Sequence, residues 1–440
     1  MLQKISNCLF AVIALTFFSC NNHSGNKTIT DSVAPAPVMV TDTAAKPVVF
    51  EADTTTLAAN TQPAFFSLTP HHIQLQKGVE LDLQIPKGYN ISIAYQGLKR
   101  LRFLAKSPDG RLFATDMRDK SDNKKGRVYI FDAWSDSLRA FTKIYTFLDN
   151  LHNPNQVAFY HNNGKDFIYV AETGSLSFYE YHAGDTIALG TPVIVATFPD
   201  YGLSYKYGGW HLTRSLSFHN NKLYVSVGSS CNVCIEKEWE RATVIEMNPD
   251  GSDKKVFASG LRNSVGLKWI GNQLWATSMG RDLIGPDRPE DLFLRVEKGK
   301  QYHWPYYFQF QGKIFPDEPM QDSARKNGIA VPPPPPVAFC GFKAHTAPLG
   351  FDYFEGFADS SLNHSFLVAL HGSTSVWRER GNAIVKVNGV NDYEEVVTGF
   401  LTGKTEAERK GRPCDVLMND AKSFFFTDDH NGVLYYVWKE

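Results

Sequence analysis

Three polar residues near the starts of predicted strands have the chemistry of an acid–base site. His211 follows Gly208-Gly209-Trp210, and because imidazole titrates near neutrality, this side chain is a candidate general base. Arg262 and Asn263 stand in the segment Gly260–Gly266, before the next predicted strand. A guanidinium is a planar, charged donor that suits a carboxylate or a developing oxyanion. A structural role stays open for both segments, as a hydrogen-bonded histidine and as a turn with a capping Asn.

Other polar segments occupy comparable positions along the chain. Met279–Asp287 combines glycines, carboxylates and backbone carbonyls, the donors that a hard cation such as Ca²⁺ selects, although the EF-hand spacing is absent. His345 lies in the segment Ala344–Gly350. Arg412 precedes the last predicted repeat unit, in the position that His211 has in its own unit.

The elements that must position these residues are short strands in repeated units. Each unit pairs a short strand with a strongly β-prone strand after a turn, and the turns Pro108-Asp109-Gly110 and Pro249-Asp250-Gly251 suit hairpins. Six units spaced by roughly 50 residues are typical of four-stranded propeller blades. The units begin at Leu104, Asn155, Arg214, Asn263, Pro348 and Pro413. We therefore predict an all-β, six-bladed β-propeller with four-stranded antiparallel blades. The longest gap indicates an insertion between the fourth and fifth units, at about Gln301 to Ala344.

The N-terminus has the pattern of an export signal. Lys4 precedes an apolar run from Leu9 to Phe18, and that run is about half the ~20 residues that a membrane-spanning helix needs. Ser19-Cys20 follows and resembles a bacterial lipoprotein signal, in which the cysteine is lipidated. Ordinary secretion remains the alternative. We expect a signal peptide over 1–20, a flexible Ser/Thr/Ala/Pro-rich linker over 21–64 and the propeller over 65–440. The protein would then be lipid-anchored in the bacterial cell envelope, periplasmic or at the outer membrane.

The cysteines of the exported part meet an oxidising compartment, which permits disulfides. Cys231 and Cys234 form a CxxC segment that lacks the following His of a haem c site and a second pair for zinc. A local disulfide or loop-shaping pair is expected, with metal binding as the alternative, and spacing alone does not fix the pairing.

The charge and composition exclude some functions. The 45 Lys+Arg and 46 Asp+Glu residues give a formal net charge of -1, which argues against nucleic acid or an anionic membrane as a partner held by net charge. A hydrophobic content of 43% fits a packed globular protein.

The motifs together resemble the glucose/sorbosone dehydrogenase family over about Leu75 to Val437. The similar stretches are Gly209–Arg214, Val227–Cys234, Gly260–Gly266, Met279–Asp282, His303–Pro305, Ala344–Gly350, Leu370–Ser373 and Gly411–Val416. The resemblance implies a six-bladed propeller that binds pyrroloquinoline quinone (PQQ) and Ca²⁺ and oxidises a sugar.

The resemblance also implies roles for single residues. His211 is similar to the family's catalytic base, and Arg262 and Asn263 are similar to the pair that contacts the quinone oxygens and stabilises charge there. Gly280 and Arg281 resemble the positions whose carbonyls hold Ca²⁺. His345 and Arg412 resemble residues that bind the cofactor.

The sequence departs from the glucose dehydrogenase branch at identifiable positions. Trp210 stands where that branch has an acidic residue, and His371–Ser373 and Cys414 stand where it has a lysine and a second arginine on PQQ. The chain is therefore more similar to the sorbosone-type branch.

The predicted function is PQQ- and Ca²⁺-dependent oxidation of an aldose or related sugar, with electrons passed to an acceptor in the envelope. One alternative is a propeller that binds saccharide or protein without redox chemistry. Another is a Ca²⁺-dependent lactonase-type propeller, which would need several convergent carboxylates.

Overall fold

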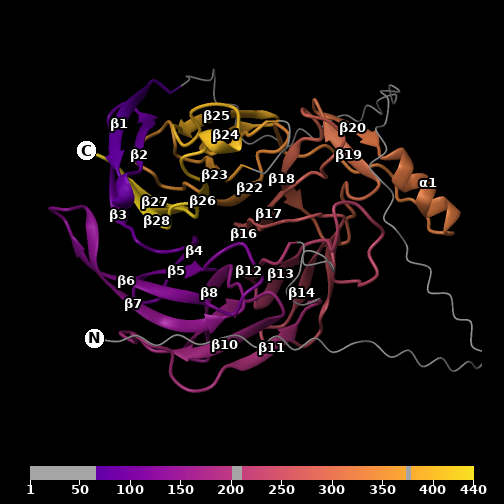
Figure 1. Cartoon of the computed structure of the whole chain (residues 1–440). Helices are drawn as coiled ribbons and strands as arrows, with labels where there is room; N and C mark the ends of the chain where they lie inside the picture. Colours follow the sequence, from indigo (N-terminus) through magenta and orange to yellow (C-terminus); the bar gives the residue numbers. More distant parts are fainter. Residues whose placement is uncertain (1–65, 201–210, 373–377) are drawn as a thin grey trace, which may run out of the picture. The chain divides into compact units, whose positions relative to one another are not determined.

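Six four-stranded antiparallel sheets contain most of the strands in the computed structural model, which describes residues 66–200, 211–372 and 378–440 (Figure 1). These residues belong to one unit, Ala44–Glu440. The first strand of each sheet contacts the first strands of its two neighbours, in the closed order β4, β8, β12, β16, β22, β26 and back to β4. This ring confirms the predicted six-bladed propeller, and each predicted repeat unit begins within or just before one of the inner strands.

The blades are numbered 1 to 6 along the chain, and the strands of each blade are given from the inner strand to the outer strand. Blades 1 to 3 are β4 (Leu101–Lys106), β5 (Leu112–Asp116), β6 (Gly126–Ser135) and β7 (Ala140–Leu151); β8 (Gln156–Asn162), β9 (Lys165–Ala171), β10 (Ser175–Tyr181) and β11 (Val193–Thr197); and β12 (Arg214–His219), β13 (Lys222–Val227), β14 (Thr243–Met247) and β15 (Lys255–Ser259). Blades 4 to 6 are β16 (Leu267–Ile270), β17 (Gln273–Ser278), β18 (Asp291–Val296) and β21 (Cys340–Phe342); β22 (Pro348–Tyr353), β23 (Phe366–Leu370), β24 (Ala383–Gly389) and β25 (Asp392–Val397); and β26 (Pro413–Asp420), β27 (Ser423–Asp428), β28 (Val433–Lys439) and β3 (Tyr89–Tyr95).

The ring is closed by a strand from the other end of the described chain. β3 pairs antiparallel with β28, with Ile91 opposite Val437. The last blade is thus completed by residues that precede the first repeat unit, so the two ends of the propeller are held by backbone hydrogen bonds. A separate hairpin, β1 (Leu68–Gln74) with β2 (Glu80–Pro86), precedes this strand and contacts β25.

The insertion occupies the expected stretch of sequence, but the expectation that it joins the fourth and fifth units is wrong. Cys340–Phe342 pairs with β18 as the outermost strand of blade 4, so the insertion joins the third and fourth strands of one blade instead of two blades. It carries the hairpin β19 (Tyr307–Phe310) and β20 (Lys313–Pro316) and the helix α1 (Glu318–Lys326). A strand of three residues has too little periodicity to be predicted from sequence.

Apolar side chains fill the spaces between neighbouring blades. Six clusters of buried residues lie there, one at each junction. Phe113 of β5, for example, packs edge-on against Phe159 of β8, with 5.1 Å between ring centroids. In the described ranges, no helix combines the length and the apolarity that crossing a bilayer requires.

Polar side chains join the inner strands near the axis. Arg102 donates from Nε and Nη2 to Asn155 Oδ1 at 3.2 and 3.0 Å, and Asn155 Nδ2 donates to Ser215 Oγ at 2.9 Å. The Ser215 hydroxyl donates in turn to the Val265 carbonyl. These bonds link blades 1 to 4 in sequence and hold the starts of their inner strands together.

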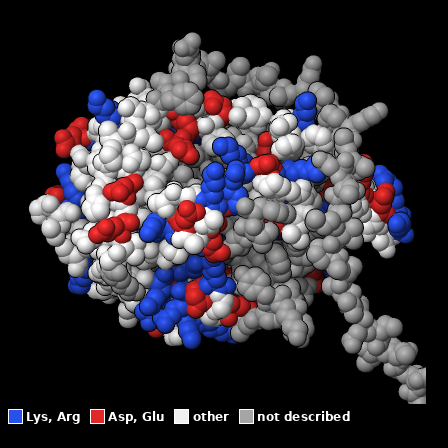
Figure 2. All heavy atoms as spheres, turned by 45° about the horizontal axis from the view of Figure 1, so that its top comes forward, with Lys and Arg blue, Asp and Glu red and all other residues white. Residues whose placement is uncertain are grey.

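The blade topology places two kinds of link at one end of the propeller. Because each blade is an antiparallel meander, the link into an inner strand and the link between the second and third strands leave from the same end of the blade. We call this end the site face. Every site residue predicted within the propeller lies on such a link or at the start of an inner strand. Basic and acidic side chains are interspersed over the surface that Figure 2 presents.

Candidate functional site

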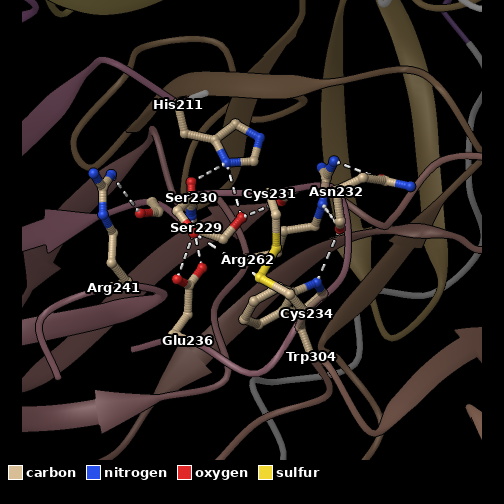
Figure 3. Close-up of a disulfide and its surroundings, with 11 residues drawn as sticks. His211, Ser229, Ser230, Cys231, Asn232, Cys234, Glu236, Arg241, Arg262 and Trp304 are labelled. Carbon is tan, nitrogen blue, oxygen red and sulfur yellow. Dashed lines mark hydrogen bonds between the residues drawn. A yellow bond between two sulfur atoms is a disulfide. The ribbon is translucent and has the colours of Figure 1, made fainter. Parts of the chain in front are cut away.

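His211 is held by the backbone of the link that follows β13. Its Nδ1 lies 2.9 Å from the Ser229 carbonyl oxygen and 2.9 Å from Ser229 Oγ (Figure 3). A carbonyl only accepts, so the proton resides on Nδ1, and Nε2 is the basic nitrogen. His211 has a φ of 54°, a left-handed conformation that non-glycine residues adopt mainly where the surroundings impose it.

A glycine allows His211 and Asn263 to approach each other. A Cβ on Gly228 would lie 2.5 Å from the His211 Cβ and 2.7 Å from Asn263 Oδ1. No side chain fits at such distances, so residue 228 must be glycine for the two side chains to converge. Asn263 Nδ2 also contacts Met279 Sδ at 3.4 Å.

The surroundings of His211 keep its imidazole neutral. Burial, followed by the positive charge of Arg262, lowers the pKa of His211 well below its usual value of 6.5. At neutral pH the ring therefore carries a single proton, on the nitrogen that faces Ser229. This is the protonation state that a general base requires.

Arg262 is buried and held by four hydrogen bonds. Its Nε donates to the Asn232 carbonyl at 2.8 Å and its Nη1 to the Gly280 carbonyl at 2.9 Å. Its Nη2 donates to Asn232 Oδ1 at 3.0 Å and to Asp282 Oδ2 at 3.3 Å. The guanidinium is thus fixed in one orientation beside His211.

A disulfide shapes the loop that holds this arginine. Cys231 and Cys234 are joined, and Asn232 lies between them (Figure 3). Asn232 Oδ1 accepts from the Asp282 backbone N–H at 2.7 Å as well as from Arg262, and Trp304 Nε1 donates to its carbonyl at 3.1 Å. In the sequence, the one signal for Asn232 is its place inside the CxxC segment, which does not predict its contact with Arg262.

His345 joins this group through Asp282. His345 Nε2 lies 3.1 Å from the Gly285 carbonyl oxygen and Nδ1 lies 3.6 Å from Asp282 Oδ1. Burial lowers the pKa of His345, but the hydrogen bonds with Asp282 and the Gly285 carbonyl and the charge of Asp291 together outweigh it and leave the pKa raised. Asp282 therefore balances two basic side chains, Arg262 and His345.

The segment expected to hold Ca²⁺ has oxygen donors, but a cation already faces one of them. The Gly280 carbonyl accepts from Arg262, and the Arg281 side chain pairs with Asp317 at 2.6 Å. A divalent ion at the Gly280 carbonyl would meet the guanidinium at close range, and like charges repel strongly there. As the side chains lie, this segment does not fit a resident Ca²⁺.

Arg412 belongs to a second group of charges, from blades 5, 6 and 1. Its Nε donates to the His371 carbonyl at 3.0 Å, and its backbone N–H donates to Asp428 Oδ1 at 2.8 Å. Burial lowers the pKa of Arg412 to about 10. Nearby, the buried Asp429 carboxylate contacts His371 Nε2 at 2.8 Å.

More cations lie here than the motifs indicated. Arg100 and Arg102 pair with Asp429 at 3.1 and 2.8 Å. Lys120 comes from the exposed loop between β5 and β6, and loss of hydration around its ammonium, followed by the charges of Arg412 and Arg100, lowers its pKa to about 8. Arg100, Arg102, Arg412 and Lys120 thus lie around the Asp429 carboxylate, and this excess of cations favours an anionic ligand at this part of the site face. Lys120 and Arg100 lie far from Arg412 in sequence, so no local motif predicts that they lie near it.

The structure therefore brings His211, Arg262, Asn263, Gly280 and His345 together and places Arg412 in a neighbouring group. A backbone bond from the Gly372 N–H to the Thr346 carbonyl, at 2.7 Å, connects the two groups. Cys20, Trp210 and Ser373 lie outside the described residues.

Sequence comparisons find one similar protein and no family. No family model matches the chain. An uncharacterized protein from Borreliella burgdorferi is 26% identical over 374 residues, which are 81% of this chain and 91% of that protein.

Several solved structures share the fold. The holo form of the PQQ domain of pyranose dehydrogenase from Coprinopsis cinerea matches with a TM-score of 0.66 and 16% identity over 83% of this chain and 98% of that chain. A calcium structure of a Trichoderma reesei carbohydrate-active enzyme of family AA12 matches with a TM-score of 0.64 and 15% identity over 87% and 99%. The apo form of the soluble aldose sugar dehydrogenase from Escherichia coli gives 0.50 and 13% over 80% and 100%.

Proposed function

We propose that this chain is an oxidoreductase that oxidises an aldose or related sugar with PQQ bound on the site face, as a member of the sorbosone-type branch. The observation that carries the proposal is the neutral, half-buried His211, whose Nδ1 is fixed on the Ser229 carbonyl at 2.9 Å beside Arg262. The likeness of the fold to that of PQQ-domain and sugar dehydrogenase structures supports it.

In the proposed reaction, His211, Ser229 and Arg262 have different roles. His211 Nε2 takes the proton of the sugar hydroxyl, while the Ser229 carbonyl keeps the proton on Nδ1 and stabilises the resulting imidazolium. Arg262, held by Asn232 and Asp282, presents a fixed positive charge to the reacting group. PQQ, when bound, supplies an ortho-quinone that accepts the hydride.

The second group of charges fits the anionic cofactor. PQQ carries three carboxylates, and Arg412, Lys120 and Arg100 offer three cations that lie around the Asp429 carboxylate. Loss of hydration and the neighbouring charges of Arg412 and Arg100 lower the pKa of Lys120 more than the Asp429 carboxylate raises it. These three residues would hold the carboxylates. Ca²⁺ takes no part in the proposed reaction.

The test is a titration of the purified mature domain with PQQ, followed by addition of sugars. We expect the absorbance of bound PQQ to change when an aldose is added, and we expect His211→Gln to keep PQQ binding while losing turnover. Saturable PQQ binding without any sugar-dependent change across a broad panel would contradict sugar oxidation. Absence of PQQ binding would contradict the cofactor and favour the saccharide- or protein-binding alternative.

A further inference from the structure

Three links on the site face bring a histidine and two carboxylates together, apart from the groups described above. Asp122 comes from the link between β5 and β6, His152 from the link between β7 and β8, and Asp200 from the segment after β11. One potential ligand atom from each lies within 4.8 Å of the other two. His152 Nε2 contacts Asp122 Oδ1, and its Nδ1 lies 3.6 Å from Asp200 Oδ2.

A buried oxygen of one of these carboxylates is unsatisfied. The Asp122 side chain is 3% exposed, and among the described residues its Oδ2 has no hydrogen-bond partner. Leaving a buried polar atom unpaired costs about 1–3 kcal/mol, and more for a charged group. Asp122 Oδ1 already contacts the histidine ring, so the second oxygen of the same carboxylate lies beside the cluster. An unpaired oxygen there indicates a missing ligand, and an ion is one explanation of such an atom.

The backbone around the cluster is held in place before any ligand binds. The Asn123 N–H donates to Asn153 Oδ1 at 2.8 Å, and Asn153 Nδ2 donates to the Ser121 carbonyl at 2.8 Å, so the first two links are tied together. On the third side, a Cβ on Gly174 would lie 3.0 Å from Asp200 Oδ2. The glycine leaves room for the carboxylate to reach the cluster.

We propose that Asp122, His152 and Asp200 bind a divalent transition-metal ion, with Zn²⁺ the best match. An imidazole nitrogen suits zinc, whereas Ca²⁺ takes oxygen ligands. Two carboxylates and a neutral imidazole supply two negative charges, which balance the ion. Three protein ligands leave a coordination position open to water or another small ligand. The site is independent of the proposed PQQ chemistry, since it uses none of those residues.

The rival explanation is a plain ion-paired histidine, in which an imidazolium lies between two carboxylates. That arrangement satisfies the histidine, but it leaves Asp122 Oδ2 unpaired. The two explanations differ in their response to metal, because an imidazolium with both nitrogens protonated has no lone pair for an ion.

The experiment is a zinc titration of the metal-stripped mature protein, with affinity measured by competition against a chromophoric chelator. We expect one equivalent of Zn²⁺ to bind at pH 7.5, with millimolar Ca²⁺ unable to displace it. Asp122→Asn keeps the size of the side chain and removes the charge, and we expect at least tenfold weaker zinc binding. The matched control is His161→Gln, which alters an exposed His–Asp pair at 2.8 Å and should bind zinc like the wild type.

Two further measurements keep the result interpretable. Cys231 and Cys234 with Glu236 form another possible zinc group if their disulfide is reduced, so the titration is run without reductant and repeated on the Cys231→Ser/Cys234→Ser protein. Should Asp122→Asn fail to fold, Co²⁺ bound to the wild type would be examined for a spectrum without thiolate charge-transfer bands. Zinc binding that is absent, or equal in Asp122→Asn and the control, or lost in the serine variant, would overturn the proposal.

Discussion

Replacing His211 by Gln removes the basic nitrogen while keeping a donor of similar reach for the Ser229 carbonyl, which lies 2.9 Å from Nδ1. The side chain is half-buried, so a smaller residue would also leave space beside Ser229, and Gln limits that effect. General-base catalysis contributes about 10²- to 10⁴-fold, or about 2.7–5.4 kcal/mol of the barrier. We therefore expect turnover to fall by that factor with little change in PQQ affinity.

The pH profile tests the same residue by a different route. His211 works in its neutral form, and burial together with Arg262 holds its pKa well below 6.5. Activity should therefore stay level as pH falls through 6.5 and decline only in more acidic solution. Arg262→Gln removes the like charge, raises the pKa of His211, and should move this decline toward pH 6.5.

Steady-state kinetics from pH 4.5 to 8.5, with PQQ binding measured in parallel, would check both expectations. Near wild-type turnover in His211→Gln would refute the role of the base. A wild-type decline that begins at or above pH 6.5 would refute the argument from burial and Arg262.

Four more outcomes are expected. Lys120→Met should weaken PQQ binding at least tenfold in a spectral titration, because it removes a cation from the group around Asp429; unchanged affinity would exclude Lys120 from the cofactor site. Millimolar Ca²⁺ should leave the melting temperature of the wild type unchanged and raise that of Arg262→Leu, because the substitution clears the guanidinium from the Gly280 carbonyl; no rise in the variant would show that the arginine is not what excludes the ion. Burial lowers the pKa of His303 to about 3, so below pH 6.5 this residue takes up a proton only in the unfolded chain, and the free energy of unfolding falls as pH falls. In urea unfolding, His303→Phe should make this fall smaller by about 1.4 kcal/mol per pH unit. An unchanged dependence of the unfolding free energy on pH would contradict this. Mass spectrometry of the mature protein should find a lipidated Cys20 at the N-terminus, and an unmodified N-terminus elsewhere would rule out the anchor.

The propeller could be predicted because its units repeat. A strand, a turn and a β-prone strand recur from Leu104 to Pro413, and each copy became the inner part of one blade. The closing strand β3 has no such signal, because its place depends on pairing with β28 at the far end of the described chain. The outer strand β21 was missed since three residues carry no periodicity.

The sequence by itself determined which side chains are present at the starts of the inner strands, and so which chemistry the site face can offer. His211, Arg262 and Arg412 stand at corresponding positions of the third, fourth and sixth units, and local pattern sufficed to find them. What those groups can do depends on their neighbours in space. Only the tertiary structure placed Asn232 on Arg262 and Lys120 near Arg412. The physical reason is that protonation states and charge balance depend on burial and on distances of a few ångströms, which a closed ring of blades sets between residues far apart in the chain.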